Sequence, residues 1–355
     1  MPAVRDPAFE RRLEELRREA HVRGRVEGRG VDVAGGPIPV NQPPNKPNTR
    51  LGASEDNAGK VGYYGMPAIK PPVWTWEIPL YFFIGGAAGM AAVIAMATLF
   101  LGRMEITRPA MWIGAVGGVL TPVLLVMDLG RPLLFLNMLR VFKPQSAMSM
   151  GVYILTPFGM AVIPGALAME LYAWHIVPAG IWTTLLHLAV YALVIVSGLS
   201  GMLLATYTGV LIGATAVPAW HTHRVILPLH FGIAGLGTAA SILELLGYRI
   251  RPLDAIVWFA IGVETLLWLW LFKKHGAADR TVHEGRSGIM LKTAEILTGP
   301  LALVLRACGL VPLSAASFVA GAFISRFGWI QAGKLSAKDP AAVFASQSAG
   351  GKGDV

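Results

Sequence analysis

Recurring apolar stretches of about 20 residues, beginning near Ile78, constrain the fold of this chain most strongly. A helix of that length crosses the hydrocarbon core of a bilayer, which is about 30 Å thick. Backbone polar groups in lipid must be bonded within the segment, so these stretches are expected to be helices. Only 14% of residues are charged and 54% are hydrophobic. We therefore predict an all-α integral membrane protein with about eight transmembrane helices. The expected spans are residues 78–102, 110–129, 149–170, 181–213, 224–247, 252–273, 293–309 and 311–331.

Polar segments precede and follow these spans. Residues 1–73 form a polar N-terminal extension, with a short charged helix expected at 6–20 and a Pro- and Gly-rich strap at 35–72. The charged helix is either solvated or a docking element for a soluble partner. Residues 336–355 form a polar C-terminal tail.

The net charge of +9 lies mainly in tails and loops. Such charge is attracted to the inner face of a bilayer, so we do not interpret it as nucleic-acid binding. An even number of spans places both termini on one side, and that side carries more Lys and Arg, which predicts cytoplasmic termini. The single cysteine, Cys308, excludes a cysteine-ligated cluster held by this chain, so any iron–sulfur cluster belongs to a partner.

The segment Trp74–Gly89 closes the polar extension and opens the first span. Glu77 and Tyr81 are four residues apart and so share one face of a helix. A quinone needs an apolar slot with polar groups at its two oxygens. We interpret this mouth as a quinone headgroup site, with Glu77 and Tyr81 as acid–base groups and Trp76 and Phe82 as walls for the ring.

Ionisable residues inside spans are energetically costly and are therefore site candidates. Glu264 lies near the middle of the sixth span and is either a neutral or paired carboxyl, with Arg306 as a possible partner, or a proton relay. Glu170 and Glu244 close their spans, where they can reach water or extend a proton path.

The turn MDLGRP after the second span contains Asp128 and Arg131. These residues either form an ion pair that caps the turn or shape a partner-facing rim beside the headgroup site. His187 and His230 lie on neighbouring spans and raise the alternative of haem ligation. Each helix carries only one such histidine, so neither haem nor a metal is expected in this chain.

Several segments together resemble the NrfD/PsrC family, the membrane subunits of polysulfide-reductase-type complexes. The resemblance covers about residues 74–340, and each segment alone is weak. The matching segments are WTWEIPLYFFIGGAAG (74–89), the MDLGRP turn, SAMSMGVY (146–153), YTGVLIGATAVPAW (207–220), LPLHFGIAGLGTAASILELL (227–246) and ISRFGWIQAGKLSAKDP (324–340).

The resemblance implies two four-helix bundles, here residues 74–220 and 221–335. It implies electron exchange between a membrane quinone, menaquinone or ubiquinone, and a ferredoxin-like iron–sulfur subunit that connects to a catalytic, molybdopterin-type subunit. It places the quinone pocket in the first bundle, at Glu77, Tyr81 and Tyr207. Some members have another polar residue where Tyr81 stands, which would leave proton delivery to Glu77.

We therefore expect a quinone-reactive subunit of a respiratory oxidoreductase complex in the bacterial cytoplasmic membrane, not catalytic alone and with a possible role in proton translocation. The alternatives are a proton-conducting subunit without quinone chemistry of its own, a passive haem-free anchor, or a transporter.

Overall fold

The computed structural model describes residues 69–129, 135–176, 178–273 and 279–350, and every element within these ranges is a helix. The charged helix expected at 6–20, most of the strap and Arg131 lie outside the described residues.

Eight helical segments are long and apolar enough to cross a membrane, which confirms the predicted fold class. They are α2 (Glu77–Phe100), α3 (Met104–Met127), α5 (Ala147–Ala173), α6 (Ile181–Gly213), α8 (Ile226–Leu245), α9 (Arg251–Phe272), α11 (Gly285–Thr298) continued by α12 (Pro300–Ala307), and α13 (Val311–Ser336). Shorter helices are α4 (Asn137–Arg140), α7 (Pro218–Thr222), α10 (Arg280–His283) and α14 (Pro340–Gly350). We call the end where α2 begins and α13 finishes the terminal end, and the opposite end the distal end.

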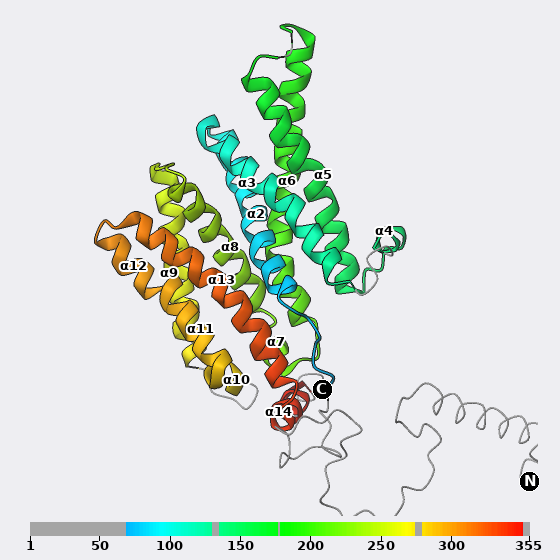
Figure 1. Cartoon of the computed structure of the whole chain (residues 1–355), viewed down its shortest axis with the longest axis vertical. Coiled ribbons are helices and arrows are strands. Elements are labelled where there is room, and N and C mark those ends of the chain that lie inside the picture. Colours follow the sequence, from blue (N-terminus) through cyan, green and yellow to red (C-terminus); the bar gives the residue numbers. More distant parts are fainter. Residues whose placement is uncertain (1–68, 130–134, 177, 274–278, 351–355) are drawn as a thin grey trace, which may run out of the picture. The chain divides into compact units, whose positions relative to one another are not determined.

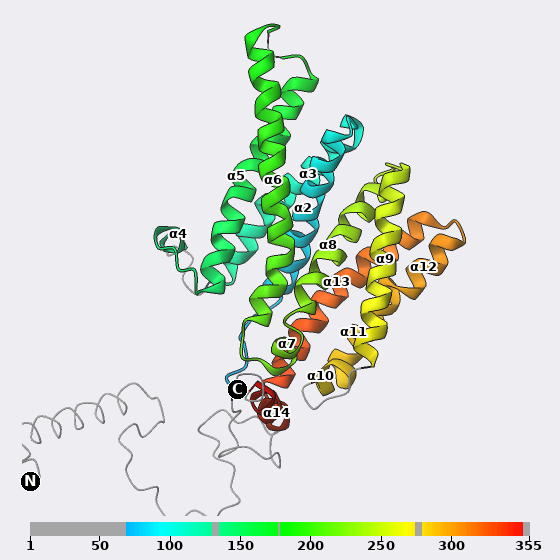
Figure 2. The same cartoon turned by 180° about the vertical axis from the view of Figure 1, so that it is seen from behind.

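The spanning helices form two groups of four (Figure 1). Helices α2, α3, α5 and α6 pack on one another, and α8, α9, α11–α12 and α13 form the second group. Figure 2 shows the same division from behind, with α6 and α8 adjacent. Helix α2 packs against both α8 and α13, so it belongs to the contact between the groups as well as to its own group.

Close contacts of α2 depend on glycine. A Cβ at Gly89 would lie 2.3 Å from the carbonyl oxygen of Gly201 on α6. On the other side of α2, a Cβ at Gly235 of α8 would lie 2.9 Å from the carbonyl oxygen of Gly86. Small residues let helix backbones approach closely in membranes. At these glycines α2 meets α6 and α8 backbone to backbone.

The seventh span differs from the expectation. We expected residues 293–309, but the helix begins at Gly285 and breaks at Gly299–Pro300. Pro300 occupies the first turn of α12, where its missing N–H costs nothing, and so restarts the helix there. Gly309 has φ 78° and forms the turn into α13. Arg286 and Lys292 made the first half of this span look like a loop.

Candidate functional site

The first turn of α2 meets the end of α3 at the terminal end, because the two helices run antiparallel. Glu77 lies in that first turn and Asp128 directly follows α3. Burial raises the pKa of Asp128, the nearby Glu77 carboxylate raises it further, and Lys334 and the backbone amide of Thr75 partly offset both effects. Lys334, near the end of α13, also donates to the carbonyl of Trp74. Two carboxyls and one ammonium group therefore gather at this mouth.

Two tyrosines lie below the mouth. Tyr81 is one turn beyond Glu77 on α2 and is buried, and it lies within electrostatic reach of Tyr207 on α6. The Tyr207 hydroxyl donates to the carbonyl of Ala147 at the start of α5. Its ring packs directly on Gly151, where a Cβ would lie 2.3 Å from the hydroxyl oxygen. The chain thus brings two phenols together between α2, α5 and α6.

Aromatic rings border this region on the side of the second group. Trp74 stacks on Trp220 with centroids 5.5 Å apart, and the Phe82 ring lies 5.9 Å from Phe231. Trp76, which we expected to wall a bound ring, is 53% exposed. Among the aromatic residues near the mouth, the structure therefore places Trp74 and Phe82 inward and leaves Trp76 at the surface.

Glu77, Tyr81, Asp128 and Tyr207 thus all lie toward the terminal end of the first group. Lys334 was not among the expected site residues. It comes from the C-terminal end of the last span, and its i+4 neighbour Lys338 gives the short basic pattern that could have drawn attention to it.

Glu264 belongs to a second, deeply buried cluster in the other group of helices. Its Oε2 lies 2.7 Å from Nδ1 of His230, and Nε2 of His230 lies 2.8 Å from the hydroxyl of Ser325. The alternative partner named for Glu264, Arg306, is wrong. Glu264 lies on the second half of α9, whereas Arg306 lies at the distal end of α12.

Glu295 and Arg326 complete this buried cluster and were missed from the sequence. Both are buried and both interact electrostatically with Glu264. The guanidinium of Arg326 stacks 3.8 Å above the Phe231 ring and donates to the Phe231 carbonyl at 3.0 Å. The rule that singled out Glu264, an ionisable group inside a span, would also have found Arg326.

Several polar atoms of the buried cluster have no hydrogen-bond partner within the described part of the chain. They are Oε1 of Glu264, Oε2 of Glu295, and Nε and Nη1 of Arg326. Buried polar atoms normally find a partner, and ordered water commonly supplies it. The cluster therefore has the donors and acceptors to hold water or to pass a proton.

Glu244 was expected to reach water, and this is wrong. It is 4% exposed and accepts from both terminal nitrogens of Arg306, with Nη1 3.0 Å from Oε2. Arg306 also donates from Nε to Asp254 at 3.1 Å, and the Asp254 side chain is half exposed. Removing an arginine charge from water requires such partners, and the two carboxylates provide them.

Glu170 is also paired rather than directed to open water. Arg108 donates to its two oxygens at 3.3 and 2.5 Å, and the Trp112 indole N–H donates at 2.9 Å. This pair joins α3 to α5 at the distal end of the first group, apart from the other proposed proton-path residues. His187 packs between the rings of Tyr172 and Tyr191. Within the described ranges, no group of three or more His, Cys, Asp or Glu side chains could hold a metal ion.

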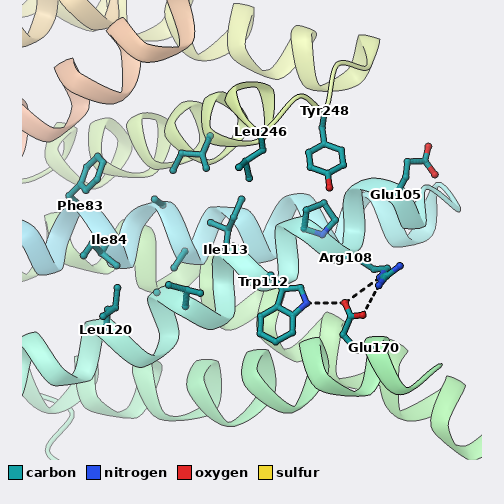
Figure 3. A pocket seen from close by; sticks show the side chains of 16 residues that line it. Phe83, Ile84, Glu105, Arg108, Trp112, Ile113, Leu120, Glu170, Leu246 and Tyr248 are labelled. Atoms are coloured by element: carbon teal, nitrogen blue, oxygen red, sulfur yellow. Dashed lines mark hydrogen bonds and ion pairs between the residues drawn. The ribbon is translucent and has the colours of Figure 1, made fainter. Parts of the chain in front are cut away.

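A cavity of about 780 Å³ lies beside α3 and extends from its distal end toward the first turns of α2 (Figure 3). Its walls come from α2, α3, α5 and the end of α8 with Tyr248. Glu105, Arg108, Glu170 and Tyr248 lie toward one end, whereas Phe83, Ile84 and Leu120 lie toward the other.

These features define a polytopic membrane protein with ionisable groups at the mouth of one helix group and buried inside the other. The family model described as "Polysulphide reductase, NrfD" matches residues 66–255, just over half of the chain. The chain belongs to this family. The match includes Glu77, Tyr81, Asp128 and Tyr207, whereas Glu264, Glu295 and Arg326 lie beyond it.

The C subunit of polysulfide reductase from Wolinella succinogenes is 29% identical over 185 residues. The alignment covers 48% of this chain and 56% of that relative. The chain thus spans little more than half the length of this relative.

Proposed function

We propose that this chain is the membrane subunit of a respiratory oxidoreductase complex, where it exchanges electrons between a membrane quinone and an iron–sulfur partner subunit. Family membership and the name of the relative support this class of complex. The observation that carries the quinone site is the convergence of Glu77, Asp128, Tyr81 and Tyr207 at one mouth. The quinone would be menaquinone or ubiquinone, and the partner a ferredoxin-like subunit connected to a catalytic, molybdopterin-type subunit.

The residues at the mouth suit proton-coupled chemistry of a quinone substrate. Reduction adds two electrons and two protons, so each substrate oxygen needs a proton donor within hydrogen-bond reach. The phenol of Tyr81 supplies a donor in an apolar setting, and the Tyr207 hydroxyl can supply a second one by giving up its bond to the Ala147 carbonyl. Glu77, which is only partly buried, exchanges protons with the aqueous side. Asp128, with its raised pKa, holds a proton more readily than an ordinary aspartate.

The electrons come from or go to the partner, which docks at the rim of the terminal end. In this proposal the complex lies in the bacterial cytoplasmic membrane with the termini of this chain on the cytoplasmic side, as the distribution of Lys and Arg favours.

Substitutions at the mouth test the quinone site in the assembled complex. In Glu77→Gln we expect quinone-linked turnover to fall by about 10²-fold, because a general acid–base group is lost. In Tyr207→Phe we expect a fall of about tenfold, because one hydrogen bond to the substrate is lost. Steady-state quinone reduction and oxidation rates measure both effects.

Two control variants make the same substitutions at other positions of the first helix group. Glu105→Gln alters the first-turn glutamate of α3 instead of α2, and Tyr191→Phe alters another tyrosine of α6. Both should assemble and turn over normally. Unchanged kinetics in Glu77→Gln and Tyr207→Phe would refute the site and favour a passive anchor.

A second function, proton translocation through α8, α9 and α11–α13, is favoured by the two buried ionic clusters. The His230–Glu264–Glu295–Arg326 cluster and the Glu244–Arg306–Asp254 cluster involve the same helix group. Their residues on α8, His230 and Glu244, are 14 positions apart, which is about 21 Å along a helix. Ser241, whose buried hydroxyl has no partner in the described part of the chain, lies between them on α8.

Proton uptake per electron in liposomes containing the complex tests this second function. Glu264→Gln and Glu295→Gln should lower the ratio while quinone turnover persists, because each removes a titratable group from the buried cluster. Glu284→Gln, at an exposed position before α11, serves as the control. An unaltered ratio in both cluster variants would show that these carboxyls do not conduct protons.

A further inference from the structure

The cavity beside α3 has the length of one bilayer leaflet. Its lining on α3 runs from Glu105 to Leu120, which is about 22 Å along the helix axis. Half of a bilayer, headgroups included, measures about 20–22 Å. The lining is mostly apolar along this length, and its polar residues gather at the distal end (Figure 3). A molecule that fills it must therefore be a chain with one polar end.

The α3 wall of the cavity faces outward. Trp112, Val116 and Leu120 are 41%, 55% and 43% exposed. In a membrane-spanning chain such a face meets lipid, so a lipid can enter from the side without passing through the helix group.

The polar end offers donors to a phosphate. Arg108 uses its Nε and one terminal nitrogen on Glu170, and its side chain is still 40% exposed. A guanidinium has five N–H groups in a planar fork, so further donors remain for a second anion. The indole N–H of Trp112 is occupied by Glu170. That bond fixes the carboxylate, and with it the orientation of Arg108.

Two further arginines closely follow Tyr248 of the lining in the sequence. Glu105 pairs with Arg103 at 3.5 Å, so its charge is balanced. Arg249 and Arg251 follow Tyr248 in the loop and the first turn of α9, and the described structure shows no ion pair for either. Asp254, one turn further, is held by Arg306. A phosphodiester anion complements the free N–H donors of Arg108 more strongly than a neutral quinone headgroup does.

We propose that this cavity binds one phospholipid of the distal leaflet, with an acyl chain along α3 and the phosphate at Arg108. A lipid tail gains no hydrophobic energy on moving from bulk lipid to a protein groove, because both surroundings are equally apolar. Selective retention must therefore come from the phosphate contact and from the shape of the groove. The polar end of the groove lies at the opposite end of α3 from the proposed quinone site, whereas its apolar end reaches Phe83 and Ile84 on α2. Substitutions at the polar end therefore test this proposal separately from the quinone site.

Native mass spectrometry of the full-length chain, purified from membranes in mild detergent, tests the proposal, with bound lipid identified by fragmentation. We expect one retained phospholipid on the unmodified protein. Val116→Trp should lower its occupancy by about tenfold, because the indole fills the groove. Val119→Trp is the matched control, since Val119 is 51% exposed on the same helix and does not line the cavity.

Arginine variants test the headgroup contact. Arg108→Gln should lower occupancy by a similar factor, whereas Arg140→Gln, at an exposed position outside the lining, should retain the lipid. If Arg108→Gln does not fold, the comparison of the two valine variants still decides. The proposal is overturned if the unmodified protein retains no phospholipid, if the retained molecule is a quinone, or if Val116→Trp and Val119→Trp retain equal amounts.

Discussion

Asp128 illustrates how position alone gives an ordinary residue unusual properties. It directly follows α3, and antiparallel packing places it beside the first turn of α2, where Glu77 lies. Burial and this second carboxylate both favour the protonated form of Asp128, so its pKa rises above the ordinary value of 3.8.

This raised pKa predicts how stability depends on pH. The folded state binds the Asp128 proton more tightly than the unfolded state, so the contribution is fully present below pH 3.8 and is lost as pH rises through the folded pKa. Thermal unfolding of the purified protein should therefore show a decline above pH 3.8 that is reduced in Asp128→Asn. Glu77→Gln should lower the folded-state pKa of Asp128, because it removes the repulsion between the two carboxylates. The pH range over which stability declines should therefore be narrower in this variant. An identical pH profile in Asp128→Asn would contradict this assignment.

Residue identity predicted the candidates better than their partners. Glu264 stood out because a carboxylate in a span is rare. Its partner His230 was considered only for haem, because sequence does not show which faces of α8 and α9 meet. Glu295 was missed because the expected span began at residue 293, which placed Glu295 at a helix end, whereas it lies near the middle of the segment Gly285–Ala307.

At the scale of helices, the contact of α5 with α6 positions Tyr207. The Tyr207 ring occupies the space where residue 151 would carry a side chain, and its hydroxyl bonds to the backbone of the same helix at Ala147. Glycine at position 151 is therefore a requirement of the site, although its sequence context, SAMSMGVY, shows only a small residue in an apolar span.

We predict that Gly151→Ala displaces Tyr207. The added methyl would overlap the ring, which costs about 1–3 kcal/mol when a packed core must adjust. Both the thermal midpoint and quinone-linked turnover should fall. In the control Gly159→Ala, also on α5, the nearest atom to the new Cβ is 3.9 Å away, so it should be tolerated. Equal effects of the two substitutions would show that the Tyr207 packing does not matter.

At the scale of the whole chain, the hydropathy pattern was sufficient to predict the fold class, because the thickness of a bilayer sets the length of each span. It was sufficient for α6, whose expected bounds of 181–213 match the helix, since this span contains no Lys, Arg, Asp or Glu. Hydropathy did not predict the bounds of the seventh span, because charged residues lie inside α11 and because Pro300 starts a new helix, α12. The gathering of Glu77, Asp128 and Lys334 depends on three helix ends meeting, which no local pattern encodes.

The backbone contacts of α2 have a mechanical consequence. Gly89 touches α6 and Gly86 touches α8 without an intervening side chain, so α2 cannot shift without carrying its neighbours along. The helix that bears Glu77 and Tyr81 also presses Phe82 onto Phe231, on whose ring the guanidinium of Arg326 rests. A displacement at the mouth would therefore reach the charged interior of the other four helices through a continuous series of packed groups.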